Sequence, residues 1–286
     1  MRTARTLREL REALKGERRA GETIGLVPTM GFFHEGHLSL IRRAREQCGF
    51  VVVSLFVNPA QFGPSEDLAG YPRDEARDLA QARAEGVDLV FAPPVEEVYP
   101  AGFASAVEVS GLTDTLEGDP GQRGREHFRG VTTLVAKLLN MVRPDVAFFG
   151  QKDAQQALVI RKLVRDLDFD VRIEVCPTVR DRDGLALSSR NTYLSASERE
   201  RALALSRALR AAETLVARGE VDGGAVLAAA RSELKAGGIE PDYLELRSAT
   251  DLSPVERVNG STLLAVAARV GEARLIDNTV LQGVTG

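Results

Sequence analysis

TIGLVPTMGFFHEGHLSLIRRA, residues 23–44, is the stretch that decides the fold of this chain. An apolar run ends at Pro28 and leads into a Gly-rich turn. After the turn, Leu38, Ile41 and Ala44 are spaced so that they share one face of a helix. The sequence therefore predicts a strand, a loop and a helix in that order.

Strand-like and helix-like stretches alternate along the first 176 residues. The run from Phe50 to Val57 is apolar without alternation, which is typical of a strand covered on both faces of a parallel sheet. Such alternation predicts an α/β domain with a parallel, doubly wound sheet. Further strands are expected at 87–92, 146–149 and 171–175, and helices at 1–14, 73–86, 131–142 and 154–167.

The character of the chain changes after Cys176. A loop rich in Arg, Asp and Ser leads into a long Ala/Leu/Arg pattern at 196–218, and a second helical pattern follows at 224–235. These features predict a smaller α+β domain over residues 177–286, after a first domain over residues 1–176. Its short strands are expected at 243–247, 263–270 and 274–276.

Composition and charge exclude several classes of protein. Hydrophobic residues make up 44% and charged residues 27% of the 286 residues, the balance of a globular protein. The net charge of −4 is spread along the chain, which disfavours a nucleic-acid partner. The longest apolar run is far shorter than the roughly 20 residues of a membrane span, and the N-terminus lacks a secretory pattern. Two cysteines predict buried thiols in the cytoplasm rather than a disulfide framework.

The first candidate site is His34-Glu35-Gly36-His37, at the predicted start of a helix. A helix N-terminus binds phosphate through its unpaired N–H groups and partial positive charge. Gly31 and Gly36 allow the backbone to approach a ligand closely, and the two imidazoles can donate to phosphoryl oxygens. The pattern favours a nucleoside triphosphate. A pair of surface histidines is the alternative, and zinc is disfavoured because the other His and Cys residues lack metal-site spacing.

The second candidate site is Gly150-Gln151-Lys152-Asp153, at the end of a predicted strand. Lys152 is a compact charge on a flexible stem, suited to following a phosphoryl group during reaction. Asp153 could accept from a ribose hydroxyl. A solvated turn for Lys152 and a helix N-cap for Asp153 are the alternatives.

The third candidate site is Leu187-Ser188-Ser189-Arg190-Asn191, in the loop that opens the second domain. Two hydroxyl groups and a guanidinium could clamp the leaving pyrophosphate, because Arg binds phosphate through charge-assisted bonds. The loop is expected to close over ATP. A helix-entry loop with routine capping serines is the alternative.

In this order, these motifs resemble the pantothenate synthetase (pantoate–β-alanine ligase) family along nearly the whole chain. The resemblance implies a Rossmann-like nucleotidyltransferase-type domain at 1–176, a lid domain at 177–286 and a cytoplasmic homodimer. It implies condensation of pantoate with β-alanine through a pantoyl-adenylate, with ATP as co-substrate, Mg²⁺, and no membrane partner. The passages that carry it are Pro28–His37, Phe56–Phe62, Tyr71–Arg73, His127–Val131, Phe149–Gln156, Ser188–Asn191 and Arg274–Asn278.

The resemblance also implies roles for single residues. His34 and His37 contact the phosphates, with His37 as catalytic proton donor, and Met30 lies beside both substrates through its backbone. Gln61 and Gln156 hold pantoate, and we expect neutral amides there because an Arg would lower the nucleophilicity of the attacking carboxylate.

The remaining roles concern the nucleotide. The residues that hold it or cover its phosphates are Gly150, Lys152, Asp153, Val179 at the adenine pocket, and Leu187, Ser188, Ser189 and Arg190. The magnesium ligands are unknown, with Asp78 and Gln81 as second-rank candidates. Gln151 stands where the family usually has Glu, and Phe32-Phe33 replaces Ala-Leu or Asn-Leu.

Two other functions are compatible with parts of this pattern. An adenylyltransferase that leaves AMP on its product would need no amine pocket, and a small aminoacyl-tRNA synthetase relative would need a basic surface that this mildly acidic chain lacks. An ATP-binding sensor without activity would normally lose His37, Lys152 or the Ser-Ser-Arg group, all of which are present.

Overall fold

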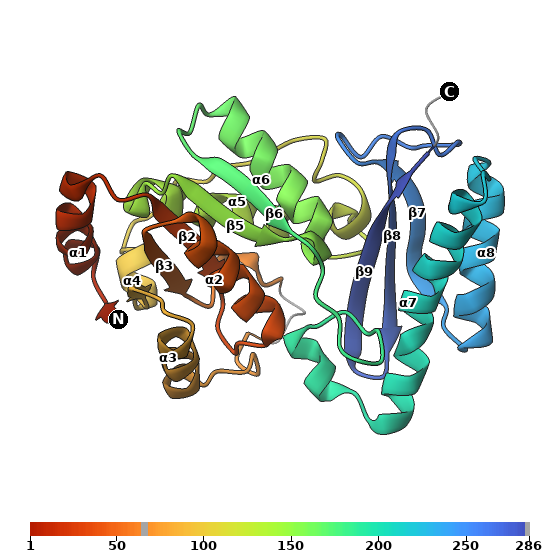
Figure 1. The fold of residues 1–286 in the computed structure, drawn as a ribbon, viewed down its shortest axis with the longest axis horizontal. Helices are drawn as coiled ribbons and strands as arrows, with labels where there is room; N and C mark the ends of the chain where they lie inside the picture. The colour runs from red at the N-terminus through yellow and green to blue at the C-terminus, as the bar shows by residue number, and fades with distance from the viewer. Residues whose placement is uncertain (64–67, 284–286) are drawn as a thin grey trace. The chain divides into compact units, whose positions relative to one another are not determined.

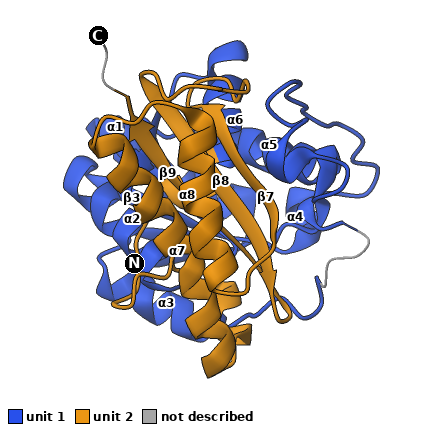
Figure 2. Cartoon of the chain, turned by 90° about the vertical axis from the view of Figure 1, so that its right-hand side faces the viewer, with its two compact units in different colours: residues 1–150, 155–177 blue, residues 151–154, 178–286 orange. Residues whose placement is uncertain are grey.

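The computed structural model describes residues 1–63 and 68–283, which form two compact units (Figures 1 and 2). Unit 1 comprises residues 1–150 and 155–177. Unit 2 comprises residues 151–154 and the chain from Thr178 onward. The division into domains at 176–177 stays a prediction, and the short segment 151–154 groups by its contacts with unit 2.

Unit 1 is built on a six-stranded parallel sheet, which confirms the predicted doubly wound α/β architecture. Its strand order is β1-β4-β3-β2-β5-β6, so successive strands run outward from β2 in one direction and from β5 in the other. Ligands of such sheets bind where the order reverses, beyond the carboxyl ends of the strands. The strands are β1 Arg2–Ala4, β2 Ile24–Thr29, β3 Phe50–Leu55, β4 Leu89–Phe91, β5 Val146–Gly150 and β6 Arg172–Cys176.

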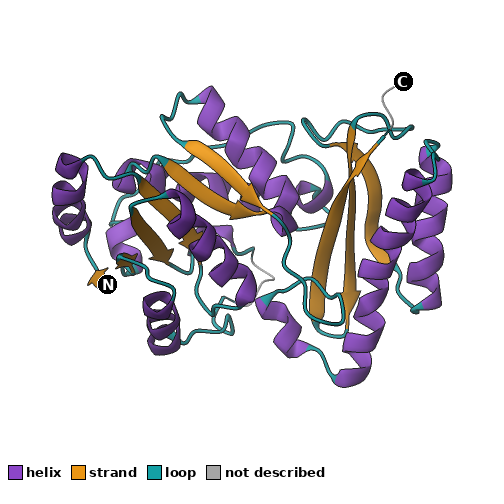
Figure 3. Ribbon diagram, in the orientation of Figure 1, coloured by secondary structure: helices purple, strands orange, loops and turns teal. Residues whose placement is uncertain are grey.

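Helices flank this sheet (Figure 3). Helix α2 packs against β2, β3 and β5, and its Ile41 and Ala44 are fully buried, as the spacing in residues 23–44 predicts. The helices with residues in unit 1 are α1 Leu7–Ala20, α2 Glu35–Gln47, α3 Glu75–Ala84, α4 Val95–Val98, α5 Gly124–Val142 and α6 Ala154–Asp166, with the 3-10 helices η1 Pro59–Gln61 and η2 Leu116–Gly118.

Two of the helix predictions have wrong boundaries. Residues 2–4 form the edge strand β1, paired in parallel with β4, and the helix begins at Leu7 because Thr6 and Glu9 make a capping box. Helix α5 begins at Gly124, earlier than predicted. A Cβ on Gly130 would lie 2.1 Å from the Ala60 carbonyl oxygen, so this helix tolerates a glycine to pack closely on η1.

Unit 2 consists of a three-stranded antiparallel sheet, ordered β7-β8-β9, and two helices that pack on it (Figure 2). Its last strand runs to Gln282 rather than ending at 276, because β9 pairs with β8 from Val270↔Ala273 to Ser261↔Gln282. The elements are η3 Gln151–Asp153, η4 Ser189–Tyr193, α7 Ala196–Ala217, α8 Gly223–Ala236, β7 Pro241–Ser248, β8 Ser261–Val270 and β9 Ala273–Gln282. None of the helices in residues 1–63 and 68–283 has the length and apolar character to cross a membrane.

Candidate active site

The turn between β2 and α2 carries the two histidines of the first candidate site. Gly31 and Phe32 both have positive φ angles, +84° and +50°, so the chain reverses sharply before the helix. Phe33 is 1% exposed and packs in a core cluster of unit 1, whereas Phe32 is half-buried. Phe33 therefore anchors the turn.

His34 and His37 cap helix α2 reciprocally. His34 Nδ1 accepts a hydrogen bond from Gly36 N at 3.1 Å, and His37 Nδ1 accepts one from His34 N at 3.4 Å. Because each Nδ1 acts as an acceptor, the hydrogen of each neutral imidazole lies on Nε2. The ring centroids are 4.1 Å apart, so the two imidazoles lie side by side at this helix start.

The side-chain amide of Gln61 is held in one orientation by a buried neighbour. Asn58 is fully buried and donates to Gln61 Oε1 at 3.1 Å and to Gly130 O at 3.0 Å. Asn58 Oδ1 accepts from the Tyr99 hydroxyl at 2.8 Å, which fixes the orientation of the Asn58 amide. Gln61 Oε1 is therefore occupied, and its Nε2 is directed to Met30 Sδ at 2.8 Å.

His127 holds the backbone at the same place. Its Nδ1 lies 2.7 Å from the Gln61 carbonyl oxygen, and its Nε2 lies 3.1 Å from Arg123 Nη1. A carbonyl only accepts and a guanidinium only donates, so His127 is the neutral tautomer with its hydrogen on Nδ1. Gln61 is thus held through both its side chain and its carbonyl oxygen.

Of the two adjacent glutamines on α6, Gln155 has a structural role. It is 6% exposed, donates to the carbonyl oxygens of Leu112 and Thr115, and accepts from Glu117 N. Gln156 follows it and is half-buried. Burial thus separates the two, a difference that their identical side chains conceal in the sequence.

In unit 2, the segment with Lys152 is fixed by Asn278 of β9. Asn278 is 5% exposed, and its Nδ2 donates to the carbonyl oxygens of Gln151 and Lys152 at 3.0 and 2.8 Å. Asn278 Oδ1 accepts from Gln151 Nε2 at 3.0 Å. A Glu at position 151 would place an acceptor against this oxygen, so Gln151 is matched to its partner. Lys152 Nζ lies 3.6 Å from Asp153 Oδ1.

The loop before α7 is anchored by a bidentate ion pair. Arg180 Nη2 lies 2.9 Å from Asp277 Oδ1, Nη1 contacts Oδ2 at 2.5 Å, and Asp277 is 3% exposed. Burial opposes the charge of Arg180, but the carboxylate more than offsets it and raises the pKa of Arg180. Leu187 N donates to Val179 O at 3.0 Å, so these two residues lie opposite one another within the loop.

The family follows from the comparison with known proteins. Residues 2–280 match the family described as pantoate-beta-alanine ligase. The chain belongs to the pantoate–β-alanine ligase family. A curated relative, the pantothenate synthetase of Moorella thermoacetica, is 52% identical over 285 residues, which is 99% of each chain. This ligase family therefore supplies the reaction: the protein is an enzyme that joins pantoate to β-alanine.

Two solved structures of the ligase family support the fold assignment. Pantothenate synthetase from Thermus thermophilus matches with a TM-score of 0.91 and 48% identity, over 98% of this chain and 99% of that one. The ligase of Francisella tularensis, solved with beta-gamma ATP and beta-alanine, matches with a TM-score of 0.79 and 31% identity, over 98% and 97%. The nucleotidyltransferase-type fold implied by the sequence resemblance is confirmed.

The residues expected to act in this ligase fall into two groups. Met30, Gly31, His34, Gly36, His37, Gln61 and Gln156 lie in unit 1, with Gly150 at the end of β5. Lys152, Asp153, Val179, Leu187, Ser188, Ser189 and Arg190 lie in unit 2.

Asn58 and His127 hold Gln61, and Tyr99 holds Asn58; these three residues received no role from sequence. Asn58 precedes a proline, a pattern typical of a cap, and its side chain accepts from Ala60 N. The hydrogen bond from Tyr99 to Asn58 spans 41 residues and leaves no local signal. Their roles depend on tertiary contacts.

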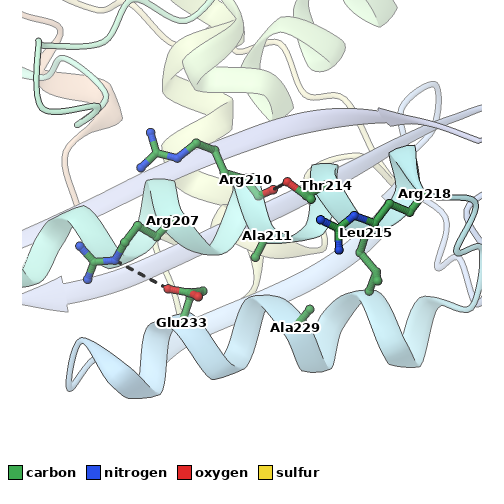
Figure 4. Close-up of a pocket in the computed structure, with 8 residues that line it drawn as sticks. All are labelled: Arg207, Arg210, Ala211, Thr214, Leu215, Arg218, Ala229 and Glu233. Atoms are coloured by element: carbon green, nitrogen blue, oxygen red, sulfur yellow. Dashed lines mark hydrogen bonds and ion pairs between the residues drawn. The ribbon is translucent and has the colours of Figure 1, made fainter.

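A groove of about 410 Å³ in unit 2 shares no lining residue with the expected ligase site (Figure 4). Arg207 pairs with Glu233 across the groove at 3.7 Å. We assign no ligand to this groove because this pair already engages one of its charged groups with another. Its lining residues are Arg207, Arg210, Ala211, Thr214, Leu215, Arg218, Ala229 and Glu233.

Proposed function

We propose that this ligase activates pantoate with ATP before it forms the amide. A pantoate carboxylate oxygen attacks the α-phosphorus of ATP, the bond to the β-phosphate breaks, and pyrophosphate leaves. The β-alanine nitrogen then attacks the acyl carbon of pantoyl-adenylate, AMP leaves, and the amine loses a proton. Atoms balance to pantothenate, AMP and pyrophosphate.

The observation that carries this proposal is the reciprocal cap at the start of α2, in which the Nδ1 atoms of His34 and His37 accept backbone hydrogen bonds. Each Nδ1 accepts within the helix cap, so Nε2 carries the donor of each ring. Donors placed in advance at a helix N-terminus stabilise the charge that develops on phosphoryl oxygens. We assign both rings to the phosphates, and His37 to proton donation.

Gln61 suits a pantoate-binding role because its network leaves the amide N–H group, which now contacts Met30 Sδ, as the donor end of the side chain. Asn58 occupies Oε1, so Nε2 is the donor for a substrate oxygen. A neutral donor orients the carboxylate without reducing its nucleophilicity as strongly as a guanidinium would. We propose that Gln61 and Gln156 both bind pantoate, and we expect Gln61→Glu to weaken pantoate binding strongly because two carboxylates repel. Unchanged pantoate affinity and turnover in that variant would contradict this role.

Lys152, Asp153 and the loop with Ser188, Ser189 and Arg190 are proposed to act on the same nucleotide, with Val179 beside the adenine. An acyl-adenylate hydrolyses when it is exposed to water, so we propose that this loop closes when ATP and pantoate bind. Equal protease sensitivity of the loop with and without the two substrates would argue against closure.

We further propose that ATP enters with Mg²⁺ and that the enzyme is a cytoplasmic homodimer. Mg²⁺ keeps several waters and binds mainly to phosphates with one or two carboxylates. Within residues 1–63 and 68–283, no three His, Cys, Asp or Glu side chains gather as a metal site. The residues present therefore fit a metal that is carried by the triphosphate rather than held in a protein cage.

Isotope-labelled pyrophosphate exchange into ATP tests the reaction. The assay contains Mg²⁺ and D-pantoate, omits β-alanine, and uses lactate and amino acids as control acids. Exchange that depends on pantoate is the expected result, because only a reversible adenylation step returns label to ATP. If exchange required a different acid and did not occur with pantoate, the adenylation mechanism would stand but pantoate would not be the substrate.

A further inference from the structure

We propose that Asp78 is a positioning residue that sets the conformation of the phosphate-binding turn from the neighbouring helix α3. The proposal rests on the proposed role of His34 and His37. It assigns a function to a carboxylate that sequence reasoning considered only as a second-rank magnesium ligand.

The carboxylate of Asp78 binds two successive backbone amides. Oδ2 accepts from Phe32 N at 2.7 Å, and Oδ1 accepts from Phe33 N at 2.8 Å. Asp78 is 2% exposed, so both oxygens are directed to the protein. Burial raises the pKa of Asp78, and the two amide hydrogen bonds oppose that shift.

The turn needs such a partner because its backbone is unusual. Phe32 adopts a φ of +50°, in the left-handed region that side chains other than glycine rarely occupy. Gly31, with a φ of +84°, lies so close that a Cβ would meet Asp78 Oδ2 at 2.9 Å and Leu55 Cδ1 at 2.7 Å. Successive amides in this kind of turn form a concavity that binds anions. Here the anion is an internal carboxylate.

Arg77 holds the same turn from the adjacent position. Its Nη2 donates to Phe33 O at 3.2 Å, and its guanidinium lies 5.2 Å from the centre of the Phe32 ring. Two neighbouring residues of α3 thus hold the amides and the carbonyl of the turn. Phe33 directly precedes His34, the N-cap of α2, so the entry angle of the imidazoles depends on this clamp.

The consequence concerns which groups can bind phosphate. The amides of Phe32 and Phe33 are occupied by Asp78, and Gly36 N is occupied by His34 Nδ1. These three amides are thus engaged within the protein, and we infer that Asp78 positions the imidazoles of His34 and His37 through the turn. A misplacement of about 1 Å can cost a hundredfold in rate.

The test compares Asp78→Asn with Glu75→Ala. The first variant replaces one acceptor oxygen by an NH₂ group that opposes a backbone N–H. The second removes an exposed carboxylate of the same helix, which pairs with Arg5, and leaves Asp74, Arg77 and Asp78 in place. The rate of single-turnover pyrophosphate release is measured as a function of ATP concentration and as a function of pantoate concentration. The chain has three histidines, so their imidazole nitrogen NMR signals can be assigned.

For Asp78→Asn we expect the adenylation rate or the ATP affinity to fall about tenfold to a hundredfold. The pantoate concentration that gives half the maximal rate should stay within about twofold of wild type. The signals of His34 and His37 should shift, and that of His127 should not. Glu75→Ala should leave kinetics and signals unchanged. A folded Asp78→Asn enzyme with wild-type ATP dependence and wild-type histidine signals would overturn the inference.

Arg77→Ala decides the case if Asp78→Asn fails to fold, because Arg77 is exposed and its loss should be tolerated. The ATP concentration that gives half-maximal pyrophosphate release should rise severalfold in Arg77→Ala. An unchanged value would contradict the proposal that α3 holds the turn. His37→Gln tests the proposed function separately. Wild-type adenylation in His37→Gln would refute the role of the imidazoles, whereas a slow His37→Gln with a normal Asp78→Asn would refute only the inference.

Discussion

The turn at residues 31–37 and the segment at residues 151–153 both follow strands of the parallel sheet. The residues that hold them lie at very different distances along the chain. The first is fixed by short-range caps between His34 and His37 and by Asp78, which is 45 residues away from Phe33. The second is fixed by Asn278, which lies 126 residues beyond Lys152 on the last strand. The loop after a strand of an α/β sheet can therefore be held by partners no more than 46 residues away or by the far end of the chain.

The largest expected effect is the loss of adenylation rate on removal of Lys152, the cation of the segment at residues 151–153. Lys152→Ala should slow adenylation by about two to three powers of ten, because its charge acts mainly in the transition state. Single-turnover pyrophosphate release measures this rate. Lys162→Ala is the matched control, since Lys162 is a surface lysine of α6 that pairs with Asp166. An unchanged rate in Lys152→Ala would remove the second segment from the chemistry.

The next effect concerns the ion pair that anchors the loop of unit 2. Arg180→Ala leaves the carboxylate of Asp277 buried without its bidentate partner, so the free energy of unfolding should fall by about 2–4 kcal/mol. Chemical denaturation measures it. Arg199→Ala, which breaks exposed pairs with Asp181 and Asp183, should cost about 1 kcal/mol or less. Equal losses in the two variants would show that burial does not distinguish them.

A smaller effect separates the two segments directly. Asn278→Ala removes the hydrogen bonds to Gln151 and Lys152, so adenylation should slow about tenfold through misplacement of Lys152. The imidazole signals of His34 and His37 should stay as in wild type, because their cap lies within unit 1. Shifted histidine signals would show that the two segments are not independently held.

The smallest effect is a pH dependence at Tyr99. Burial raises the pKa of Tyr99 to about 12, above its unfolded value near 10, so the unfolded chain loses the proton first. Stability should therefore fall as pH rises, by about 1 kcal/mol between pH 10 and pH 11. Tyr99→Phe should remove this part of the decline, whereas Tyr193→Phe should not, since Tyr193 is 49% exposed. Identical pH profiles for both variants would contradict this assignment.

Local patterns predicted most elements of the sheet and helices. The apolar run at 50–57 and the spacing of Leu38, Ile41 and Ala44 correspond to β3 and α2. Boundaries failed where a tertiary partner intervened: β1 exists because β4 offers an edge, and α5 starts early because Gly130 fits against η1. A short strand with no alternation carries no period that sequence reasoning can detect.

The sequence by itself determined the alternation of strands and helices, the family, and the residue types that carry the chemistry, because these depend on local spacing and on side-chain identity. The three-dimensional structure decided which atoms of these side chains the protein itself engages. Burial separated Gln155 from Gln156, the helix cap set the tautomers of His34 and His37, and Asn58 selected the donor of Gln61. Gln155 binds carbonyl oxygens 43 and 40 residues away, which only folding brings to it. The partners of His34, His37 and Gln61 are two or three residues away, and the backbone conformation of the folded chain sets their geometry.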